Sequence, residues 1–213
     1  MADETETNST TGTPAGRSTR SIAAPIREAL KLRLLHLGAL LTQGVTLGVK
    51  AVVADADERI LLVRHGYISG WHFPGGGVEP GETALDAGLR ELDEELGLRL
   101  GPRSVIGWLD DYPTRSGYLI TPVVLWGDGN PTLRPAHDEV LAVYRVSLET
   151  LINAEPRFIS IPESDRPVLQ LPLDNHLIHA PTGAVLYQLR QVGLLAKTGE
   201  RVDHLEQPVF AWS

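Results

Sequence analysis

The chain has 213 residues and a formal net charge of −8 at pH 7, with 42% hydrophobic and 22% charged residues. This is an ordinary globular composition with enough apolar residues for one sizeable core. The acidic balance argues against binding along a nucleic-acid polymer, although it allows a nucleotide bound through metal ions. The sequence contains no cysteine, which excludes disulfides, zinc–thiolate sites and a thiol nucleophile. We expect a cytoplasmic protein, although this composition leaves other compartments open.

Residues 1–20 are rich in Thr, Ser, Gly and acidic residues and predict a disordered N-terminal tail. They lack the basic start and apolar core that a secretory signal needs. Residues 21–43 predict an N-terminal helix whose central part, Ile26 to Leu41, carries leucines at helical spacing. That apolar part is too short to span a bilayer. We expect it to pack on its own domain, with a membrane surface or a homodimer contact as alternatives.

Two strands are predicted over residues 45–54 and 59–65, and they are joined by a polar turn. A short strand over residues 71–74 then leads into a glycine-rich segment. Further strands are predicted downstream, over residues 104–111, 118–126 and 141–146. Strands that alternate with helical segments predict an α/β or α+β domain.

Residues 75–98, GGGVEPGETALDAGLRELDEELGL, begin as an irregular loop of Gly and Pro and continue as a helix. Thr83 is the predicted N-cap, with Asp86 three residues later, and Gly97 suits the left-handed position that ends a helix. The leucines at helical spacing predict one buried stripe, formed by Leu85, Leu89, Leu92 and Leu96. The remaining faces of this helix carry mostly acidic side chains.

On this helix Glu91 lies one turn from both Glu94 and Glu95, so three carboxylates can converge on one patch. Like charges at this distance repel one another unless a hard divalent cation such as Mg²⁺ or Mn²⁺ binds between them. Arg90 lies beside the patch and could orient a glutamate through a paired hydrogen bond. For three glutamates taken alone, the alternative is a solvated acidic surface helix.

The fixed positions of this segment follow the spacing G-x5-E-x7-R-E-U-x-E-E-x-G-U, where U is aliphatic. They are Gly76, Glu82, Arg90, Glu91, Leu92, Glu94, Glu95, Gly97 and Leu98. This pattern resembles the Nudix box, and every fixed position matches. The resemblance covers about residues 44–152 and implies a Nudix-type α/β/α sandwich with a mixed β-sheet. Residues 153–213 are then expected to be a C-terminal elaboration of the same domain.

The resemblance implies Mg²⁺-dependent hydrolysis of a diphosphate bond in a small nucleoside diphosphate derivative, with Mn²⁺ as a substitute. The expected metal ligands are Glu91, Glu94, Glu95 and the carbonyl of Gly76, and Glu82 is expected to support them.

Catalytic roles follow from the same resemblance. Arg90 is expected to hold Glu91 in place, and Glu94 or Glu95 could take the proton of the attacking water. Nudix proteins frequently place a further acid downstream of the box, and Glu139 is our first choice for it. Asp138 and Asp111 are the reserves, and an exposed acidic turn is the alternative for all three.

Substrate contacts are expected from Arg64, which occupies a strand position that often reaches a substrate phosphate in this family. Tyr112 and Tyr118 could stack on an adenine or simply pack. Pro113 follows Gly97 by sixteen residues, a distance associated with ADP-ribose pyrophosphatases, although a turn proline explains it equally. ADP-ribose is thus favoured, while other nucleotide sugars, dinucleoside polyphosphates and (d)NTPs stay open.

The C-terminal third carries no substrate signal. Residues 153–178 contain several prolines and predict a long irregular segment, followed by a helix over 182–195 and an extended piece over 204–212. His176 and His179 have the spacing of a metal pair on a helix, but prolines bracket them, so we interpret them as structural.

Three other functional classes share the box. A non-catalytic Nudix-fold module that senses or binds a nucleotide often loses box glutamates, and here all are present. An isomerase of the isopentenyl diphosphate type needs a catalytic cysteine, and a coenzyme A pyrophosphatase carries an arginine-rich motif before the box. This chain has neither feature.

Overall fold

The computed structural model describes residues 45–212. The predicted tail over residues 1–20 and the predicted helix over 21–43 lie outside the described residues, so the homodimer contact suggested for that helix stays a prediction. Among residues 45–212, no helix is both long enough and apolar enough to cross a membrane.

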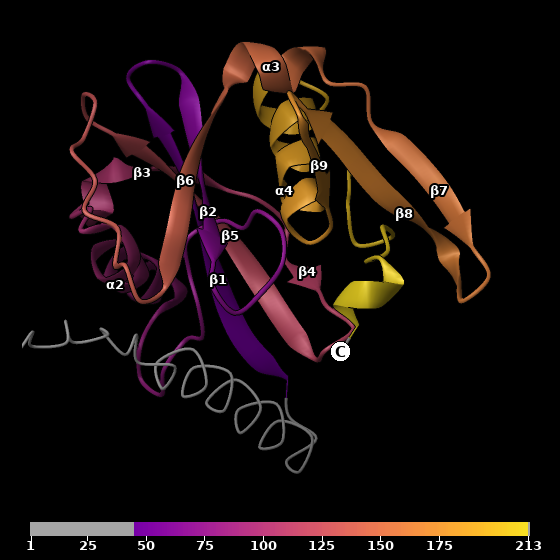
Figure 1. The fold of residues 1–213 in the computed structure, drawn as a ribbon, viewed down its shortest axis with the longest axis horizontal. Coiled ribbons are helices and arrows are strands. Elements are labelled where there is room, and N and C mark those ends of the chain that lie inside the picture. Colours follow the sequence, from indigo (N-terminus) through magenta and orange to yellow (C-terminus); the bar gives the residue numbers. More distant parts are fainter. Residues whose placement is uncertain (1–44, 213) are drawn as a thin grey trace, which may run out of the picture.

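The main sheet is mixed, as predicted, and its strands follow the order β3-β5-β1-β2-β6, with β4 paired to β5 (Figure 1). Strands β1 and β5 run parallel over ten residue pairs, whereas the other neighbours are antiparallel. The strands are β1 (Thr46–Asp55), β2 (Arg59–His65), β3 (Val105–Trp108), β4 (Tyr112–Pro113), β5 (Tyr118–Gly127) and β6 (Val140–Ser147). Four of these match the predicted strands closely, and β3 is shorter than predicted.

The predicted strand over residues 71–74 is wrong. Only His72 pairs, through an isolated bridge to Val63. Pro74 has no N–H to donate, and carbonyl groups of this loop instead accept hydrogen bonds from the backbone of β1. Ala51 N donates to Pro74 O at 2.9 Å, and Val49 N donates to Gly76 O at 2.9 Å. The loop is therefore fixed against β1 without forming a strand of the ladder.

Helix α2 (Ala84–Leu96) begins and ends as predicted. The Thr83 side chain accepts a hydrogen bond from Asp86 N at 3.1 Å, and Gly97 adopts φ 60°. A left-handed φ of this kind is readily adopted by glycine, which has no Cβ. The apolar face of α2 covers one side of the main sheet, where Leu92 and Leu96 are buried against strand residues such as Val49 and Val123.

The other side of the sheet is covered by α4 (Thr182–Gln188) and a second, three-stranded sheet (Figure 1). Its strands are β7 (Arg157–Ile161), β8 (Ser164–Leu173) and β9 (His176–His179). These elements share a core with the main sheet, as Leu171, Ile178 and Val185 pack with Val52 and Leu62. A short helix that was not predicted, α3 (Leu148–Asn153), connects β6 to the second sheet.

The prediction that residues 153–178 are irregular is wrong. The two prolines within β8 do not prevent a strand, because each lies where β8 is unpaired along one of its two edges. Pro172 pairs only with β9, since the pairing of β7 with β8 ends at Gln170. Pro167 lies at an irregularity in the β7–β8 register. Proline lacks a backbone donor and is tolerated at such unpaired positions.

The predictions of the last two elements are only partly correct. The helix over 182–195 is observed as α4 followed by a π-helical stretch, Leu189–Leu194. The extended piece over 204–212 contributes one parallel bridge, Val168 to Glu206, and then a 3-10 turn, Val209–Ala211. His176 and His179 lie on strand β9 rather than on a helix, and each packs against other rings, which agrees with a structural role.

Candidate functional site

The glycine loop and the carboxylates of α2 meet at close range. Gly75 N donates to Glu95 Oε1 at 3.2 Å, which ties the loop to the helix. A Cβ added at Gly76 would lie 2.4 Å from Glu91 Oε1, well inside van der Waals contact. Glycine at position 76 is therefore required for the Glu91 carboxylate to lie where it does.

Arg90 connects three of the predicted carboxylates. Its guanidinium donates to both oxygens of Glu82 at 3.0 and 3.1 Å, to Glu91 Oε1 at 2.9 Å and to Glu94 Oε2 at 3.0 Å. It also donates to Gly77 O at 3.1 Å. The hydrogen bond from Arg90 lowers the pKa of Glu82, and the carboxylates together raise the pKa of Arg90, with Glu82 contributing most. Arg90 thus fixes the helix, the loop and the carboxylates relative to one another.

Glu95 is the buried member of the cluster, with 3% of its surface exposed. Burial raises the pKa of Glu95 to about 7, although Lys50 and the Gly75 N–H oppose this shift. Burial likewise raises the pKa of Glu91, against the lowering effect of Arg90. Within the described residues, Glu95 Oε2 has no hydrogen-bond partner. A buried carboxylate oxygen without a donor is costly, so this atom is suited to bind a cation.

Two residues near the cluster were not predicted as site residues. The Lys50 ammonium on β1 donates to Gly75 O, and burial lowers its pKa while Glu95 and Glu91 act to raise it. His65, at the end of β2, places Nε2 4.0 Å from Glu95 Oε1. Burial lowers the pKa of His65 to about 4, so its ring is neutral. The only sequence signal for Lys50 was a lone cation within an apolar strand.

Within residues 45–212, no three His, Asp or Glu side chains already surround a common metal position. In the carboxylate cluster, the Arg90 guanidinium takes the hydrogen bonds of Glu82, Glu91 and Glu94. The donor set nevertheless fits a hard divalent cation, because carboxylate and carbonyl oxygens are what Mg²⁺ and Mn²⁺ prefer. The unpartnered Oε2 of Glu95 is the clearest single indication of that fit.

Among the three downstream acids, Glu139 lies near the cluster, since its charge contributes to the raised pKa of Glu95. Its backbone carbonyl also accepts from Gly66 N, just beyond β2. Asp138 is exposed, and Asp111 accepts a hydrogen bond from the Thr121 hydroxyl at 2.7 Å. Glu139 is thus the one of the three whose charge acts on Glu95, and its catalytic role stays a prediction.

The three predicted substrate-binding residues lie in different surroundings. Arg64 is exposed, and its guanidinium carbon lies 5.6 Å from the centroid of the Trp71 ring. Tyr112 is only 1% exposed and donates to Leu205 O at 2.9 Å, which favours the packing alternative over stacking on a base. Tyr118 is half-buried and packs against the same core cluster.

A family model described as "NUDIX domain" matches residues 45–169, more than half of the chain. The chain belongs to the Nudix family. The Nudix match starts with β1 and ends within β8, so it includes the glycine loop, α2 and the main sheet.

Several curated relatives of this Nudix chain are named as hydrolases. The "m7GpppN-mRNA hydrolase NUDT17" of Danio rerio is 31% identical over 156 residues, which are 63% of this chain and 51% of that protein. The "RNA pyrophosphohydrolase" of Legionella pneumophila is 39% identical over 64 residues, 30% of this chain and 37% of that protein. The chain thus spans about half the length, or less, of these relatives.

Solved structures also resemble this Nudix chain. The "MutT/nudix family protein from Enterococcus faecalis" has a TM-score of 0.50 at 17% sequence identity, and the match covers 90% of this chain and 79% of that one. At this identity the similarity concerns the fold alone. It agrees with the predicted mixed sheet enclosed by helices.

Proposed function

We propose that the chain is a divalent-metal-dependent hydrolase that cleaves a diphosphate bond in a nucleoside diphosphate derivative. The observation that carries the proposal is the carboxylate cluster, in which Glu91 and Glu95 lie directly against the glycine loop. Membership in the Nudix family and the hydrolase names of its relatives support the same conclusion.

The proposed ligands of Mg²⁺, or of Mn²⁺ in its place, are Glu91, Glu94, Glu95 and the carbonyl of Gly76. That carbonyl accepts from Val49 N, which leaves its second lone pair for a ligand bond. Glu82 supports the set through its paired hydrogen bonds with Arg90. A cation bound there would neutralise diphosphate oxygens and lower the pKa of a bound water.

The chain's own residues supply alignment and proton transfer. Glu139 takes a proton from the attacking water, with Glu94 and Glu95 as alternatives. Arg90 keeps Glu91 oriented, as its hydrogen bond at 2.9 Å supports. Arg64 binds a phosphate of the substrate, since a guanidinium matches phosphate geometry and the Arg64 side chain is exposed near the end of β2.

The substrate class has two candidates within this function. The position of Pro113 favours ADP-ribose, whereas the names of the curated relatives favour an m7GpppN-mRNA or another RNA. Both carry the phosphoanhydride bond that the cluster is suited to polarise.

Product analysis tests the proposed function. Purified protein would be incubated with Mg²⁺ or Mn²⁺ and ADP-ribose, NADH, a cap dinucleotide, diadenosine polyphosphates, (d)NTPs or a 5′-triphosphorylated oligonucleotide. We expect cleavage of at least one substrate, abolished by Glu94→Gln. If folded protein binds the metal but turns over nothing on this panel, the non-catalytic sensor becomes the better interpretation.

A further inference from the structure

Lys50 carries a positive charge close to the carboxylate cluster, and the proposed mechanism does not use it. The residue is half-buried and lies on β1. Burial raises the pKa of both Glu95 and Glu91, and the charge of Lys50 opposes this rise in each case. The Lys50 ammonium donates to the carbonyl of Gly75, 25 residues further along the chain. Lys50 therefore links β1 to the glycine loop through its side chain.

The hydrogen bonds of the glycine loop to β1 form a consecutive series. The carbonyls of Pro74 and Gly76 each accept from a backbone N–H of β1 at 2.9 Å. The carbonyl between them, that of Gly75, accepts from the Lys50 side chain instead. The N–H of Gly75 donates to Glu95 Oε1 at 3.2 Å. Both polar groups of Gly75 are thus held by charged side chains, one from β1 and one from α2.

Gly75 has a backbone conformation that favours glycine. Its φ is 130°, and a Cβ at this position would lie 2.3 Å from Val49 O. Gly75 is also buried, so its carbonyl has to find its hydrogen-bond donor within the protein. A buried acceptor that loses its donor is destabilising. The hydrogen bond from Lys50 therefore favours the observed orientation of the peptide that joins Gly75 to Gly76.

The orientation of this peptide determines where Gly76 lies. The carbonyl of Gly76 is a proposed metal ligand, and a Cβ at Gly76 would lie 2.4 Å from Glu91 Oε1. A rotation of the peptide between Gly75 and Gly76 would therefore move the carbonyl and change the contact with Glu91. Groups outside the ligand shell that orient metal ligands commonly influence metal affinity. Lys50 is such a group, because it acts on a ligand through the backbone of the loop.

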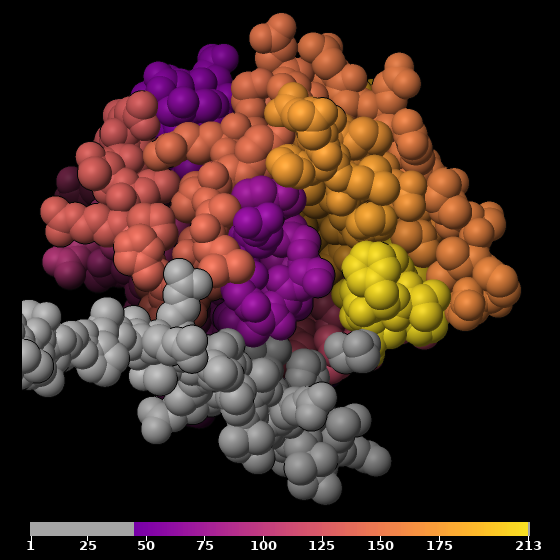
Figure 2. All heavy atoms as spheres, in the orientation of Figure 1, coloured from indigo at the N-terminus to yellow at the C-terminus, as the bar shows by residue number. Residues whose placement is uncertain are grey.

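The segment before the glycine loop lies largely at the surface. In Figure 2 its purple surface lies between the orange surface that includes β6 and the orange-yellow surface of the C-terminal elements. Residues 68–70 are exposed, and Phe73 is buried in the core. Beyond Phe73, the backbone of the loop is hydrogen-bonded to β1 and α2. The position of the Gly76 carbonyl therefore depends on these contacts, and the one from Lys50 comes from a side chain that can be replaced.

We propose that Lys50 is a positioning residue for the metal site, which holds the Gly75 carbonyl and so keeps Gly76 in its place against Glu91. The inference rests on the proposed function, in which Gly76 and the carboxylates bind a divalent cation. The charge of Lys50 by itself opposes such binding, because like charges repel. Loss of the charge alone would tighten Mg²⁺ binding, whereas loss of the hydrogen bond weakens it. The two effects have opposite signs, so one measurement separates them.

The test is calorimetric titration of the full chain with Mg²⁺ alone. Lys50→Met keeps an unbranched side chain but has no donor, and we expect it to weaken Mg²⁺ binding about 10- to 100-fold. Lys50→Arg keeps both a donor and the charge, and should bind Mg²⁺ about as tightly as the parent protein. Lys197→Met makes the same substitution at an exposed lysine of the C-terminal segment and should leave the affinity unchanged.

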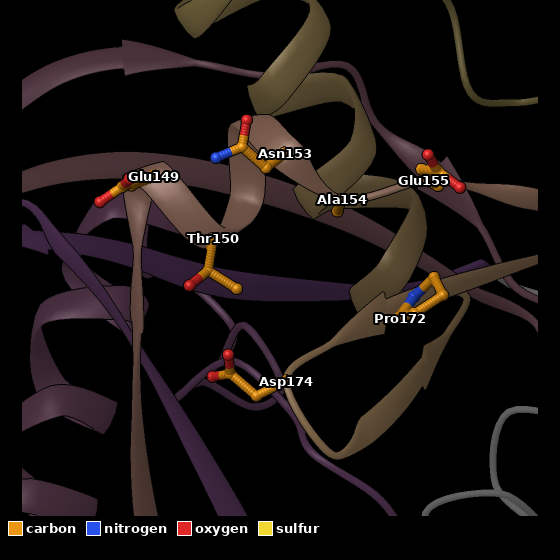
Figure 3. Close-up of a pocket in the computed structure, with 7 residues that line it drawn as sticks. All are labelled: Glu149, Thr150, Asn153, Ala154, Glu155, Pro172 and Asp174. Carbon is orange, nitrogen blue, oxygen red and sulfur yellow. The ribbon is translucent and has the colours of Figure 1, made fainter.

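A second group of carboxylates needs a control of its own. Glu149, Glu155 and Asp174 are among the residues that line a pocket of about 440 Å³ beside α3, and Figure 3 shows their side chains around it. Mg²⁺ prefers carboxylate oxygens, so the titration has to exclude a signal from this pocket. The double variant Glu149→Gln/Glu155→Gln removes its two exposed glutamates. It should bind Mg²⁺ as the parent protein does, which assigns the signal to the cluster at Gly76.

A folded Lys50→Met variant that binds Mg²⁺ as tightly as the parent protein, or more tightly, would overturn the inference. A lysine with only a structural role would lower the midpoint of thermal unfolding in the presence of a chelator and leave the Mg²⁺ affinity unchanged. If Lys50→Met does not fold, Lys50→Gln replaces it, because its shorter side chain is uncharged and withdraws the donor from Gly75. Weaker Mg²⁺ binding than in the parent protein then supports the inference, and equal or tighter binding contradicts it.

The same variants distinguish the inference from the proposed function. Weaker Mg²⁺ binding in Lys50→Met, with no turnover of any substrate on the panel by the parent protein, would leave the positioning role standing and overturn the proposed hydrolase. Turnover by the parent protein, together with unchanged Mg²⁺ affinity in Lys50→Met, would do the reverse.

Discussion

His65 Nε2 lies 4.0 Å from Glu95 Oε1, and both side chains are buried. Burial holds the pKa of His65 at about 4 and raises that of Glu95 to about 7, so around neutral pH the histidine carries no charge to offset the carboxylate. The Glu95 carboxylate is therefore charged only at a cost to the metal-free protein.

The first prediction concerns the stability of the metal-free protein. Because the folded-state pKa of Glu95 is raised from 4.5 to about 7, the free energy of unfolding falls as pH rises through this window. Glu95→Gln stays neutral and should gain up to about 3 kcal/mol over the parent protein above pH 7 and little at pH 4.5. Urea unfolding with a chelator, at both ends of the window, measures this difference.

Glu94→Gln is the control for this first prediction, because the Glu94 side chain is 58% exposed and loses little solvation. Its difference from the parent protein should change far less between the two pH values. A Glu95→Gln effect that is the same at both pH values would contradict a buried carboxylate.

Replacing Arg90 with lysine tests its role as the connector of the cluster. Lysine keeps the charge but cannot make paired hydrogen bonds to Glu82 while also reaching Glu91 and Glu94. We expect metal affinity or kcat to fall about 10- to 100-fold, measured by Mg²⁺ titration of activity. Arg99→Lys, at an exposed pair with Asp93, should leave both unchanged. Equal losses in the two variants would count against this role.

Adjacent glycines provide a matched pair of variants. Gly76→Ala would place a Cβ 2.4 Å from Glu91 Oε1, so the carboxylate has to move, whereas a Cβ at Gly77 meets nothing within 4 Å. We expect Gly76→Ala to weaken Mg²⁺ binding by about tenfold or more with little loss of stability, and Gly77→Ala to leave binding intact. Calorimetric Mg²⁺ titration checks both, and similar affinities would show that the close approach to Glu91 is unimportant.

A fourth prediction concerns the C-terminal segment. Burial acts to raise the pKa of Glu206, yet hydrogen bonds from Arg115, Ser164 and Gln207 N bring it down to about 2. Stability from this network is therefore present above the ordinary pKa of 4.5 and is lost as pH falls towards about 2. Arg115→Met should lower the free energy of unfolding at neutral pH, because the buried Glu206 carboxylate loses its guanidinium partner.

Chemical unfolding of the Arg115→Met variant at pH 7 and near pH 3 measures that cost. The difference from the parent protein should shrink at the lower pH, because Glu206 is then partly protonated in the unfolded chain. A cost that grows on acidification would contradict the assignment.

The parts of the fold that were predicted correctly are those with local causes. Helix α2 has its cap at Thr83, its end at Gly97 and its leucine stripe within fourteen residues of one another, so short-range signals sufficed. The second sheet was missed because Pro167 and Pro172 imply a break unless the pairing partners are known. Each proline lies where only one neighbouring strand, β7 or β9, pairs with β8 or where the pairing is irregular. Which edge of β8 is paired depends on the tertiary structure and cannot be seen in the local sequence.

In the candidate site, too, the features with local causes were predicted and those that depend on tertiary packing were not. The spacing of Glu91, Glu94 and Glu95 placed them on one helix, but it did not show which of them is buried. Only packing distinguishes the buried Glu95 from the exposed Glu94. Lys50 was missed because its partner, the carbonyl of Gly75, is 25 residues away and belongs to the backbone.

The parallel pairing of β1 with β5 has a kinetic consequence. Thr46 pairs with Tyr118, so the whole of α2 lies inside the chain segment that must close before these strands meet. Closing long segments is slow, whereas a capped helix forms quickly. An isolated helix of the length of α2 is only marginally stable in water, so α2 depends on its packing against these strands. The raised pKa of Glu95 comes from burial, so it is a property of the fully packed chain and not of the helix alone.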